Sequence, residues 1–239
     1  RAGRNPDPST GAILTPITQS TTFVQQAVGV HHGHTYSRAS NPTVSALESC
    51  LGALEDAPPS VCFSSGLAAE TALFLALVRA GDHIVVSDVV YGGTVRVLRE
   101  LFADLGVQST FVDAGDPANI RRAVRATTRL IFLESPGNPT LKLTDIAAVA
   151  AIARDAGIPL AVDNTFLTPV LQRPLDLGAT ISLYSTTKYI EGHNATIGGA
   201  ITSRDASLLE RLRFVRKSVG SIQSPFEAWL TLQGIKTLP

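Results

Sequence analysis

The sequence predicts an α/β domain with a mostly parallel sheet flanked by helices, preceded by an extended N-terminal arm. From residue 43 onward, short apolar runs alternate with segments of helical periodicity, an order that is typical of a parallel sheet. The apolar runs are continuous, which indicates strands buried on both faces. Residues 1–42 are instead rich in Pro, Gly, Ser, Thr and His, so we expect them to form the arm.

Each element follows from its local pattern. The first helix is expected near Pro42, because Val44, Leu47, Leu51 and Leu54 fall on one helical face. Continuous apolar runs predict strands at 60–63, 83–87, 107–112, 130–134, 159–162, 181–184 and 197–202. Apolar residues at helical spacing predict helices at 67–79, 94–105, 117–126, 145–156 and 206–217. The last residues, 231–239, resemble a helix that leads elsewhere, so we expect a C-terminal domain beyond this chain.

Composition narrows the class of protein. The 239 residues suit one large domain over 43–239, and 44% of them are hydrophobic. Twenty basic and 20 acidic residues give a formal net charge of zero, which argues against nucleic acid or a membrane surface as the main partner. Cys50 and Cys62 are too few for a disulfide framework, and reduced thiols fit a cytoplasmic protein. No metal site is predicted.

Ligands of open α/β sheets bind at the carboxyl ends of the strands, so residues after each strand are the site candidates. Gly66 and Leu67 open a helix, where backbone N–H groups and the helix dipole favour an anion. Tyr91 precedes two glycines, which leave its ring free to lie against a flat ligand. Asn138 offers an amide in a loop with two prolines. Taken singly, each is better explained as an ordinary turn.

Charged groups follow the next two strands. Asp163 ends one strand and either faces the ligand crevice or caps a turn. Ser185, Thr187 and Lys188 follow the other strand. A lysine against an apolar strand end is expected to be partly buried, and burial would lower its pKa and make its amine nucleophilic. The alternative is a solvated lysine. One strand separates Asp163 from Lys188, so the two side chains can stand together.

Together these groups match the needs of pyridoxal 5'-phosphate (PLP). Its aldehyde forms a Schiff base with a lysine amine, and its pyridine nitrogen needs a carboxylate to stay protonated. Its phosphate needs N–H and hydroxyl donors, which helix N-termini supply. A nicotinamide enzyme would instead carry G-x-G-x-x-G after the first strand, and this sequence does not. We therefore predict PLP at this edge of the sheet.

Longer motifs carry a family resemblance over the whole chain. They occupy residues 15–23, 36–43, 64–69, 91–94, 134–139, 163–165, 185–193 and 224–230, in that order. In these motifs the chain resembles the Cys/Met-metabolism (transsulfuration) PLP-dependent enzymes of fold type I. That family includes cystathionine γ-synthase, cystathionine γ-lyase, methionine γ-lyase and the O-acylhomoserine sulfhydrylases.

The resemblance implies a role for each matching residue. Lys188 is implied to be the Schiff-base lysine and proton shuttle, Asp163 the partner of the pyridine nitrogen, and Tyr91 the stacking ring with a role in proton transfer. The other implied contacts are backbone donors to phosphate at Gly66 and Leu67, hydroxyl donors at Ser185 and Thr187, and Asn138 beside the ring hydroxyl. Tyr36 and Arg38 are implied to reach the phosphate of a neighbouring subunit, in a homotetramer built from dimers with shared active sites.

The implied activity is elimination or replacement at Cγ of a sulfur amino acid or homoserine ester, of the cystathionine γ-synthase or γ-lyase type. O-acetyl- or O-succinylhomoserine sulfhydrylase is the alternative, because residues 194–196 are more similar to that branch. Ser40 and Val44 depart from the usual Gly and frequent Arg, and Gly93 stands where methionine γ-lyases typically carry Cys. The arginine for the substrate carboxylate is implied to lie in the C-terminal domain. A non-catalytic PLP-binding or assembly protein is the alternative of another class.

Overall fold

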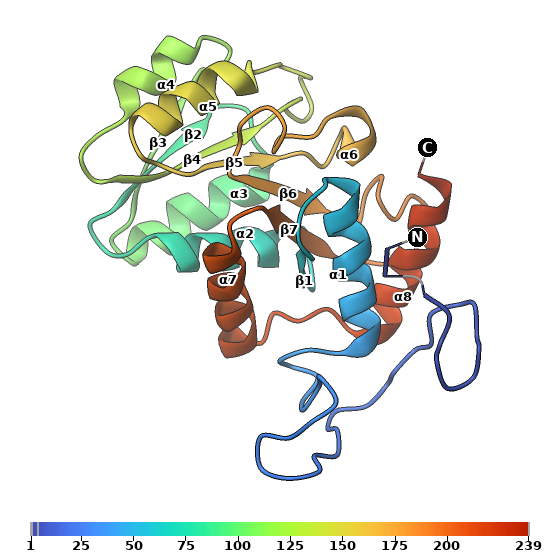
Figure 1. Cartoon of the computed structure of the whole chain (residues 1–239). Helices are drawn as coiled ribbons and strands as arrows, with labels where there is room; N and C mark the ends of the chain where they lie inside the picture. Colours follow the sequence, from blue (N-terminus) through green and yellow to red (C-terminus); the bar gives the residue numbers. More distant parts are fainter. Residues whose placement is uncertain (1, 4, 239) are drawn as a thin grey trace.

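The computed structural model describes residues 2–3 and 5–238 and contains a seven-stranded sheet with helices on both faces (Figure 1). Arg1 and Arg4 of the predicted arm, and Pro239, lie outside the described residues. The strand order is β1-β7-β6-β5-β4-β2-β3. The strands are β1 (Val61–Phe63), β2 (His83–Ser87), β3 (Gln108–Val112), β4 (Thr128–Glu134), β5 (Leu160–Asp163), β6 (Ile181–Ser185) and β7 (Gly199–Ser203).

All neighbouring strands from β6 through β3 pair in parallel. Strand β7 runs antiparallel to both of its neighbours, β6 and β1, so β1 points the same way as the parallel strands. The predicted α/β fold with a mostly parallel sheet is confirmed. The antiparallel direction of β7 was not predicted, because a strand buried on both faces has the same apolar pattern whichever way it runs.

Helices cover both faces of the sheet (Figure 1). On one face pack α2 (Gly66–Leu77), α3 (Gly92–Arg96) with the π-helical η1 (Val97–Phe102), and α7 (Ala206–Val219). On the other face, α4 (Pro117–Ala123) and α5 (Ile146–Asp155) cover one half, and α1 (Pro42–Leu54) and α8 (Pro225–Gly234) cover the half made by β1, β6 and β7. The short α6 (Thr168–Leu171) and the 3-10 helix η2 (Ile235–Thr237) complete the elements.

Successive residues of each strand enter the core on opposite faces. Ile84 and Val86 of β2 join the cluster under α2 and α7, whereas Val85 joins the cluster under α4 and α5. All three side chains are fully buried. This two-sided burial is the physical reason for the continuous apolar runs in the sequence.

One helix prediction was misplaced, and one short helix was not predicted at all. The helix at the end of the chain is α8, which begins at Pro225 and ends at Gly234, rather than a helix over 231–239. Its start is set by a capping box, in which Ser224 and Glu227 each accept from the other's backbone N–H, and by a proline in its first turn. The helix that was not predicted is α6, which is only four residues long.

The arm over residues 5–41 contains no helix or strand, only isolated bridges such as that between Thr22 and Tyr36. It extends away from the domain as the blue segment in Figure 1. Where it meets the domain, the Thr43 hydroxyl donates to Pro16 O and the Asn41 amide donates to Thr18 O. Farther out, Val24 and Val28 are almost fully exposed.

None of the helices in the described part of the chain is long and apolar enough to cross a membrane.

Candidate active site

The carboxyl ends of β1, β4, β5 and β6 and the loop after β2 surround a cavity of about 270 Å³. Every predicted site residue except Tyr36 and Arg38 lines it. The lining also includes residues for which the sequence suggested no role, chiefly Glu70, Glu134, Thr165 and Phe166. The full lining is Ser65, Gly66, Leu67, Glu70, Tyr91, Glu134, Asn138, Asp163, Thr165, Phe166, Ser185, Thr187, Lys188 and Ile197.

The first turn of α2 forms an anion cradle. Ser65 caps the helix by accepting from Ala68 N at 3.0 Å. The backbone N–H groups of Gly66 and Leu67 find no acceptor among the described residues, and they lie at the positive end of the helix dipole. A Cβ on Gly66 would stand 2.8 Å from the Ser185 Cβ, so only glycine lets the helix approach β6 this closely.

Hydroxyl groups from the end of β6 complete the cradle. Ser185 is the last residue of β6, and no partner for its hydroxyl is found among the described residues. The Thr187 hydroxyl donates to Gly198 O at 3.2 Å and accepts from Gly198 N at 3.1 Å. Ser185 can therefore donate to a phosphate as it stands, whereas Thr187 would exchange the Gly198 carbonyl for the phosphate.

Asp163 ends β5 and is buried at the floor of the cavity. Its Oδ1 accepts from Thr165 N at 3.0 Å and from the Thr165 hydroxyl at 2.6 Å. Burial raises the pKa of this carboxyl, and the two Thr165 contacts oppose the rise. The two alternatives for Asp163 therefore hold together: its side chain caps the turn at Thr165, and it also borders the crevice.

Lys188 lies in the turn after β6 and lines the cavity, but its side chain is exposed. The expectation that Lys188 is partly buried was wrong. The reason is its position three residues beyond the strand, where the cavity opens outward and the chain has left the sheet. Within the described residues its ammonium makes no hydrogen bond or ion pair, so the amine is accessible to a ligand.

The Tyr91 ring takes its position from Gly93, two residues further on. A Cβ on Gly93 would overlap the Tyr91 ring and stand 2.9 Å from Leu67 Cδ1. The ring therefore folds back over the start of α3, on the side of the cavity where Leu67 also lies. The ring is about half exposed, which leaves a face free for a flat ligand, as predicted from the Tyr-Gly-Gly pattern.

Glu134 at the end of β4 joins two of the loops. Its Oε2 accepts from Tyr91 N at 2.6 Å, and its Oε1 accepts from Asn138 N at 2.9 Å. Burial and then the charge of Asp163 raise the pKa of Glu134 to about 7, although both backbone contacts oppose the rise. The sequence carried a signal for it, because an acid at the end of a buried strand is the same signal that identified Asp163.

A polar network supports the loops from the far side of β5 and β6. The Asn164 amide donates to Gln172 O at 2.7 Å and to the Tyr184 hydroxyl at 3.2 Å, and Gln172 Nε2 donates to Ser135 O at 2.9 Å. Tyr184 in turn donates to the buried carboxyl of Glu55. The residues after Asp163 are thus tied to the start of the loop that carries Asn138.

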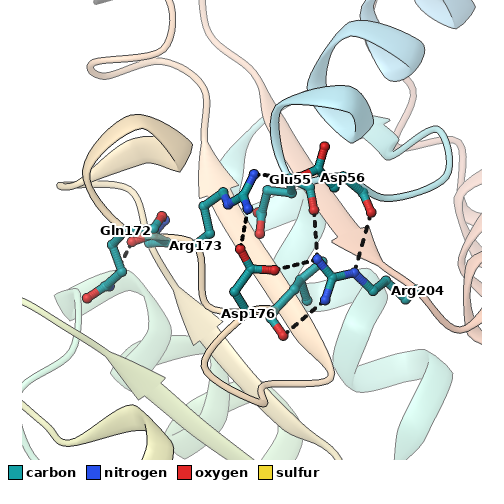
Figure 2. Close-up of polar contacts among 8 residues, drawn as sticks. Glu55, Asp56, Gln172, Arg173, Asp176 and Arg204 are labelled. Atoms are coloured by element: carbon teal, nitrogen blue, oxygen red, sulfur yellow. Dashed lines mark hydrogen bonds and ion pairs between the residues drawn. The ribbon is translucent and has the colours of Figure 1, made fainter.

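This network continues outward to a cluster of ion pairs (Figure 2). Arg204 contacts Glu55 O and the Asp176 carboxylate, and Arg173 bridges Asp176 and Asp56. These outer charges are partly exposed, so each contributes little by itself. They do close the end of α1 against the loop that leads into β6.

Tyr36 and Arg38 do not line the cavity of their own chain. The Arg38 guanidinium lies 5.2 Å from the centre of the Tyr36 ring and donates to Lys217 O at 2.8 Å. Both side chains are exposed. Within this chain, therefore, neither side chain reaches the cavity. Their contact with the phosphate of a neighbouring subunit stays a prediction.

The residues present fit PLP. The unpaired N–H groups of Gly66 and Leu67 and the Ser185 hydroxyl suit its phosphate. Asp163 supplies the carboxylate that its ring nitrogen needs, and Lys188 supplies an accessible amine. The Tyr91 face suits its ring. Fold and donor set together define a fold type I PLP-dependent enzyme.

The chain belongs to the Cys/Met metabolism PLP-dependent enzyme family, whose sequence model matches residues 1–239. The predicted family resemblance is confirmed. A probable cystathionine γ-synthase from Herpetosiphon aurantiacus is 48% identical over 99% of this chain and 74% of the relative. Cystathionine γ-lyase from Bacillus subtilis is 46% identical over 97% of this chain. Cystathionine β-lyase from Coxiella burnetii is 44% identical over 99% of this chain.

Solved structures of relatives have the same fold as this chain. The crystal structure of metB from Corynebacterium glutamicum superposes with a TM-score of 0.98 at 45% identity and covers all of this chain. Cystathionine γ-lyase from Lactobacillus plantarum, complexed with L-serine, gives a TM-score of 0.96 at 40% identity over 99% of this chain. This chain spans 62% of each of those two chains and 61% of the B. subtilis relative.

Proposed function

We propose that the protein catalyses elimination or replacement at Cγ of a sulfur amino acid or homoserine ester, as a cystathionine γ-synthase or γ-lyase does. One observation carries the proposal: Lys188, Asp163 and Tyr91 line the same cavity as the unpaired N–H groups at the start of α2. The names of the relatives support it, since they are cystathionine synthases and lyases.

The residues divide the chemistry among them. When bound, PLP supplies an electron sink for negative charge on the substrate's carbon atoms. Gly66, Leu67 and Ser185 would hold its phosphate, and Asp163 would hold the proton on its ring nitrogen. Lys188 would bind its aldehyde and, once its amine is free again, take the proton from Cα. It would give that proton up to solvent, to which it is exposed, before taking a proton from Cβ as the γ-substituent leaves. The exposed position of Lys188 suits an amine that must exchange places with an incoming substrate.

Tyr91 and Asn138 would orient the ring. The Tyr91 side chain would lie against one face of the ring, and its hydroxyl would pass a proton to or from the substrate. Asn138 would donate to the ring hydroxyl. Glu134 would position both, because it holds the backbone N–H of each residue.

A product assay on the full-length, PLP-loaded enzyme tests the proposal. O-Succinylhomoserine, O-acetylhomoserine, cystathionine and methionine are each offered with and without cysteine or sulfide. Cystathionine formed from a homoserine ester and cysteine identifies a γ-synthase, and cysteine with 2-oxobutanoate formed from cystathionine identifies a γ-lyase. Homocysteine with pyruvate formed from cystathionine would place the elimination at Cβ and overturn the proposal. Lys188→Ala, tested in parallel, should form no product.

A sulfhydrylase is the second candidate function. Residues 194–196, just beyond the turn that carries Lys188, read Asn-Ala-Thr and are similar to that branch of the family. In the same assay a sulfhydrylase forms homocysteine from a homoserine ester only when sulfide is present. A bound-cofactor absorbance band without turnover of any substrate would favour a non-catalytic PLP-binding protein.

We also propose that the protein assembles as a homotetramer built from two dimers with shared active sites, in which Tyr36 and Arg38 of the arm reach the phosphate of a neighbouring subunit. Support comes from two features of the arm. Tyr36 and Arg38 are exposed and lie outside their own cavity, and Val24 and Val28 present apolar side chains that this chain does not cover. Arginine suits phosphate because its contact is charge-assisted and often bidentate.

A further inference from the structure

Glu70 lies in the cavity although the proposed reaction does not use it. It sits on α2 one helical turn after Gly66, so its side chain is on the face of the helix that carries the anion cradle. It is 2% exposed, and its Oε2 has no hydrogen-bond partner among the described residues. Burying a polar atom without a hydrogen-bond partner costs free energy. We therefore expect this carboxyl either to contact a ligand or to carry a proton.

The groups around Glu70 favour the neutral form. The titratable groups that share the cavity with it are Asp163, Glu134, Tyr91 and Lys188, and two of these are acids. No cation among the described residues forms an ion pair with Glu70. Burial and then the charge of Asp163 raise the pKa of Glu70 to about 8; the Thr94 hydroxyl opposes the rise and the charge of Glu134 adds to it.

A purely structural role for Glu70 is the alternative. Buried acids in protein cores are normally fixed by a cation or by several donors. Glu48 shows this arrangement in the same chain, because it pairs with Arg216 and accepts from Cys62 N. Among the described residues Glu70 has no cation partner, and the Thr94 hydroxyl is the donor that acts on its pKa. It also borders the cavity rather than the core.

We propose that Glu70 is a further cofactor-site residue, a carboxyl that is protonated at neutral pH and that, when it ionises at alkaline pH, adds to the negative charge that Asp163 presents to the ring of the bound cofactor. Glu70 would act indirectly, because its charge would set how tightly the bound cofactor holds its own protons. The inference rests on the proposed function only in that PLP occupies this cavity.

Two readouts test it on the full-length protein. In the PLP-loaded enzyme, the pH midpoint of the cofactor's visible absorbance change is measured for wild type and Glu70→Gln. At alkaline pH, where Glu70 ionises, its charge would make the cofactor hold its proton more tightly, so the midpoint should fall by about one pH unit in the glutamine variant. Glu70→Asp, which keeps a carboxyl, should restore the midpoint toward wild type.

In the cofactor-free protein, thermal unfolding is followed across the same pH range. Glu70 has a folded-state pKa above its unfolded value, so the unfolded chain releases this proton first and stability falls as pH rises toward about 8. Glu70→Gln should lack this part of the fall and be more stable than wild type at alkaline pH. This readout decides the question even if the variant binds no cofactor.

Glu55→Gln is the matched control, since burial also raises the pKa of Glu55 but this residue lies outside the cavity. Its spectral midpoint should equal that of wild type. Equal midpoints and equal pH profiles in wild type and Glu70→Gln would overturn the inference. Absence of any cofactor band in the wild-type protein would instead defeat the proposed function.

Discussion

Asp163 is held by Thr165 through one carboxylate oxygen while the residue borders the cavity. Asparagine at this position keeps the size and one acceptor oxygen but removes the charge. We expect Asp163→Asn to bind PLP and to lose about 100-fold or more in kcat, because a fixed charge beside developing charge is a large part of catalysis. The measurement is turnover per bound cofactor. Near-normal turnover would mean that Asp163 only caps the Thr165 turn.

Gly93 determines where the Tyr91 ring lies. We expect Gly93→Ala to displace this ring, because the added Cβ would overlap it. Turnover should fall by about 10-fold to 100-fold while the fold persists, and the circular dichroism of bound PLP should change. Gly92→Ala is the control, since a Cβ on Gly92 meets nothing within 4 Å. Equal effects of the two variants would contradict this account of Tyr91.

At the level of single residues, the sequence predicted those site members whose position after a strand is distinctive. Asp163 is the last residue of β5, and Lys188 comes three residues after β6. The topology therefore brings both to the carboxyl edge of the sheet. Glu70 escaped prediction because an acid within a helix usually points to water, and only the tertiary packing of α2 reveals its burial. The exposure of Lys188 also depends on the shape of the cavity, which local sequence does not encode.

Among the elements, β5 and β6 are supported by the network behind them. Tyr184 donates to Glu55 and accepts from Ser182 Oγ at 2.8 Å and from the Asn164 amide. We expect Tyr184→Phe to lower the free energy of unfolding by about 1–3 kcal/mol, because buried groups lose a partner. Urea unfolding of the cofactor-free protein measures it. Tyr189→Phe is the control, because its exposed hydroxyl makes no hydrogen bond among the described residues.

Tyr184→Phe should also change how the stability of the protein depends on pH. Burial raises the pKa of Glu55 and the Tyr184 hydrogen bond opposes the rise. Since the folded-state pKa exceeds the unfolded value, stability is lost as pH rises from the unfolded pKa toward the folded one. Without Tyr184 the pKa should rise further and the loss should extend to higher pH. An unchanged pH profile would mean that the hydrogen bond has no influence on Glu55.

For elements, prediction from sequence worked where a strand or helix has its own apolar signature, as in β2 and α7, whose predicted starts agree with the structure. It failed for α6, whose four residues contain too little pattern. It also failed for the start of α8, although Ser224 and Glu227 carried the capping-box signal three residues apart.

At the scale of the whole molecule, the arm leads to a test of shared sites. Mixing unfolded Arg38→Ala and Lys188→Ala chains and refolding them together should restore roughly a quarter of wild-type activity, because half the dimers are mixed and each has one intact site. Steady-state turnover of the refolded mixture is the measurement. Lys188→Ala mixed with Asp163→Asn should restore none, since both residues line the cavity of one chain. If Arg38 serves its own chain, the first mixture should stay as inactive as the second.

The reversed direction of β7 has a consequence for how the site assembles as the chain folds. Because β7 returns alongside β6, the connection over residues 186–198 stays at the carboxyl edge instead of crossing the sheet. Lys188 therefore sits in a hairpin loop, whose closure costs little chain entropy. Asp163 and Tyr91 instead come together through contacts between distant parts of the sequence, such as that of Tyr91 N with Glu134. The nucleophile should thus be placed by an early, local event, and its partners by the slower, non-local completion of the sheet.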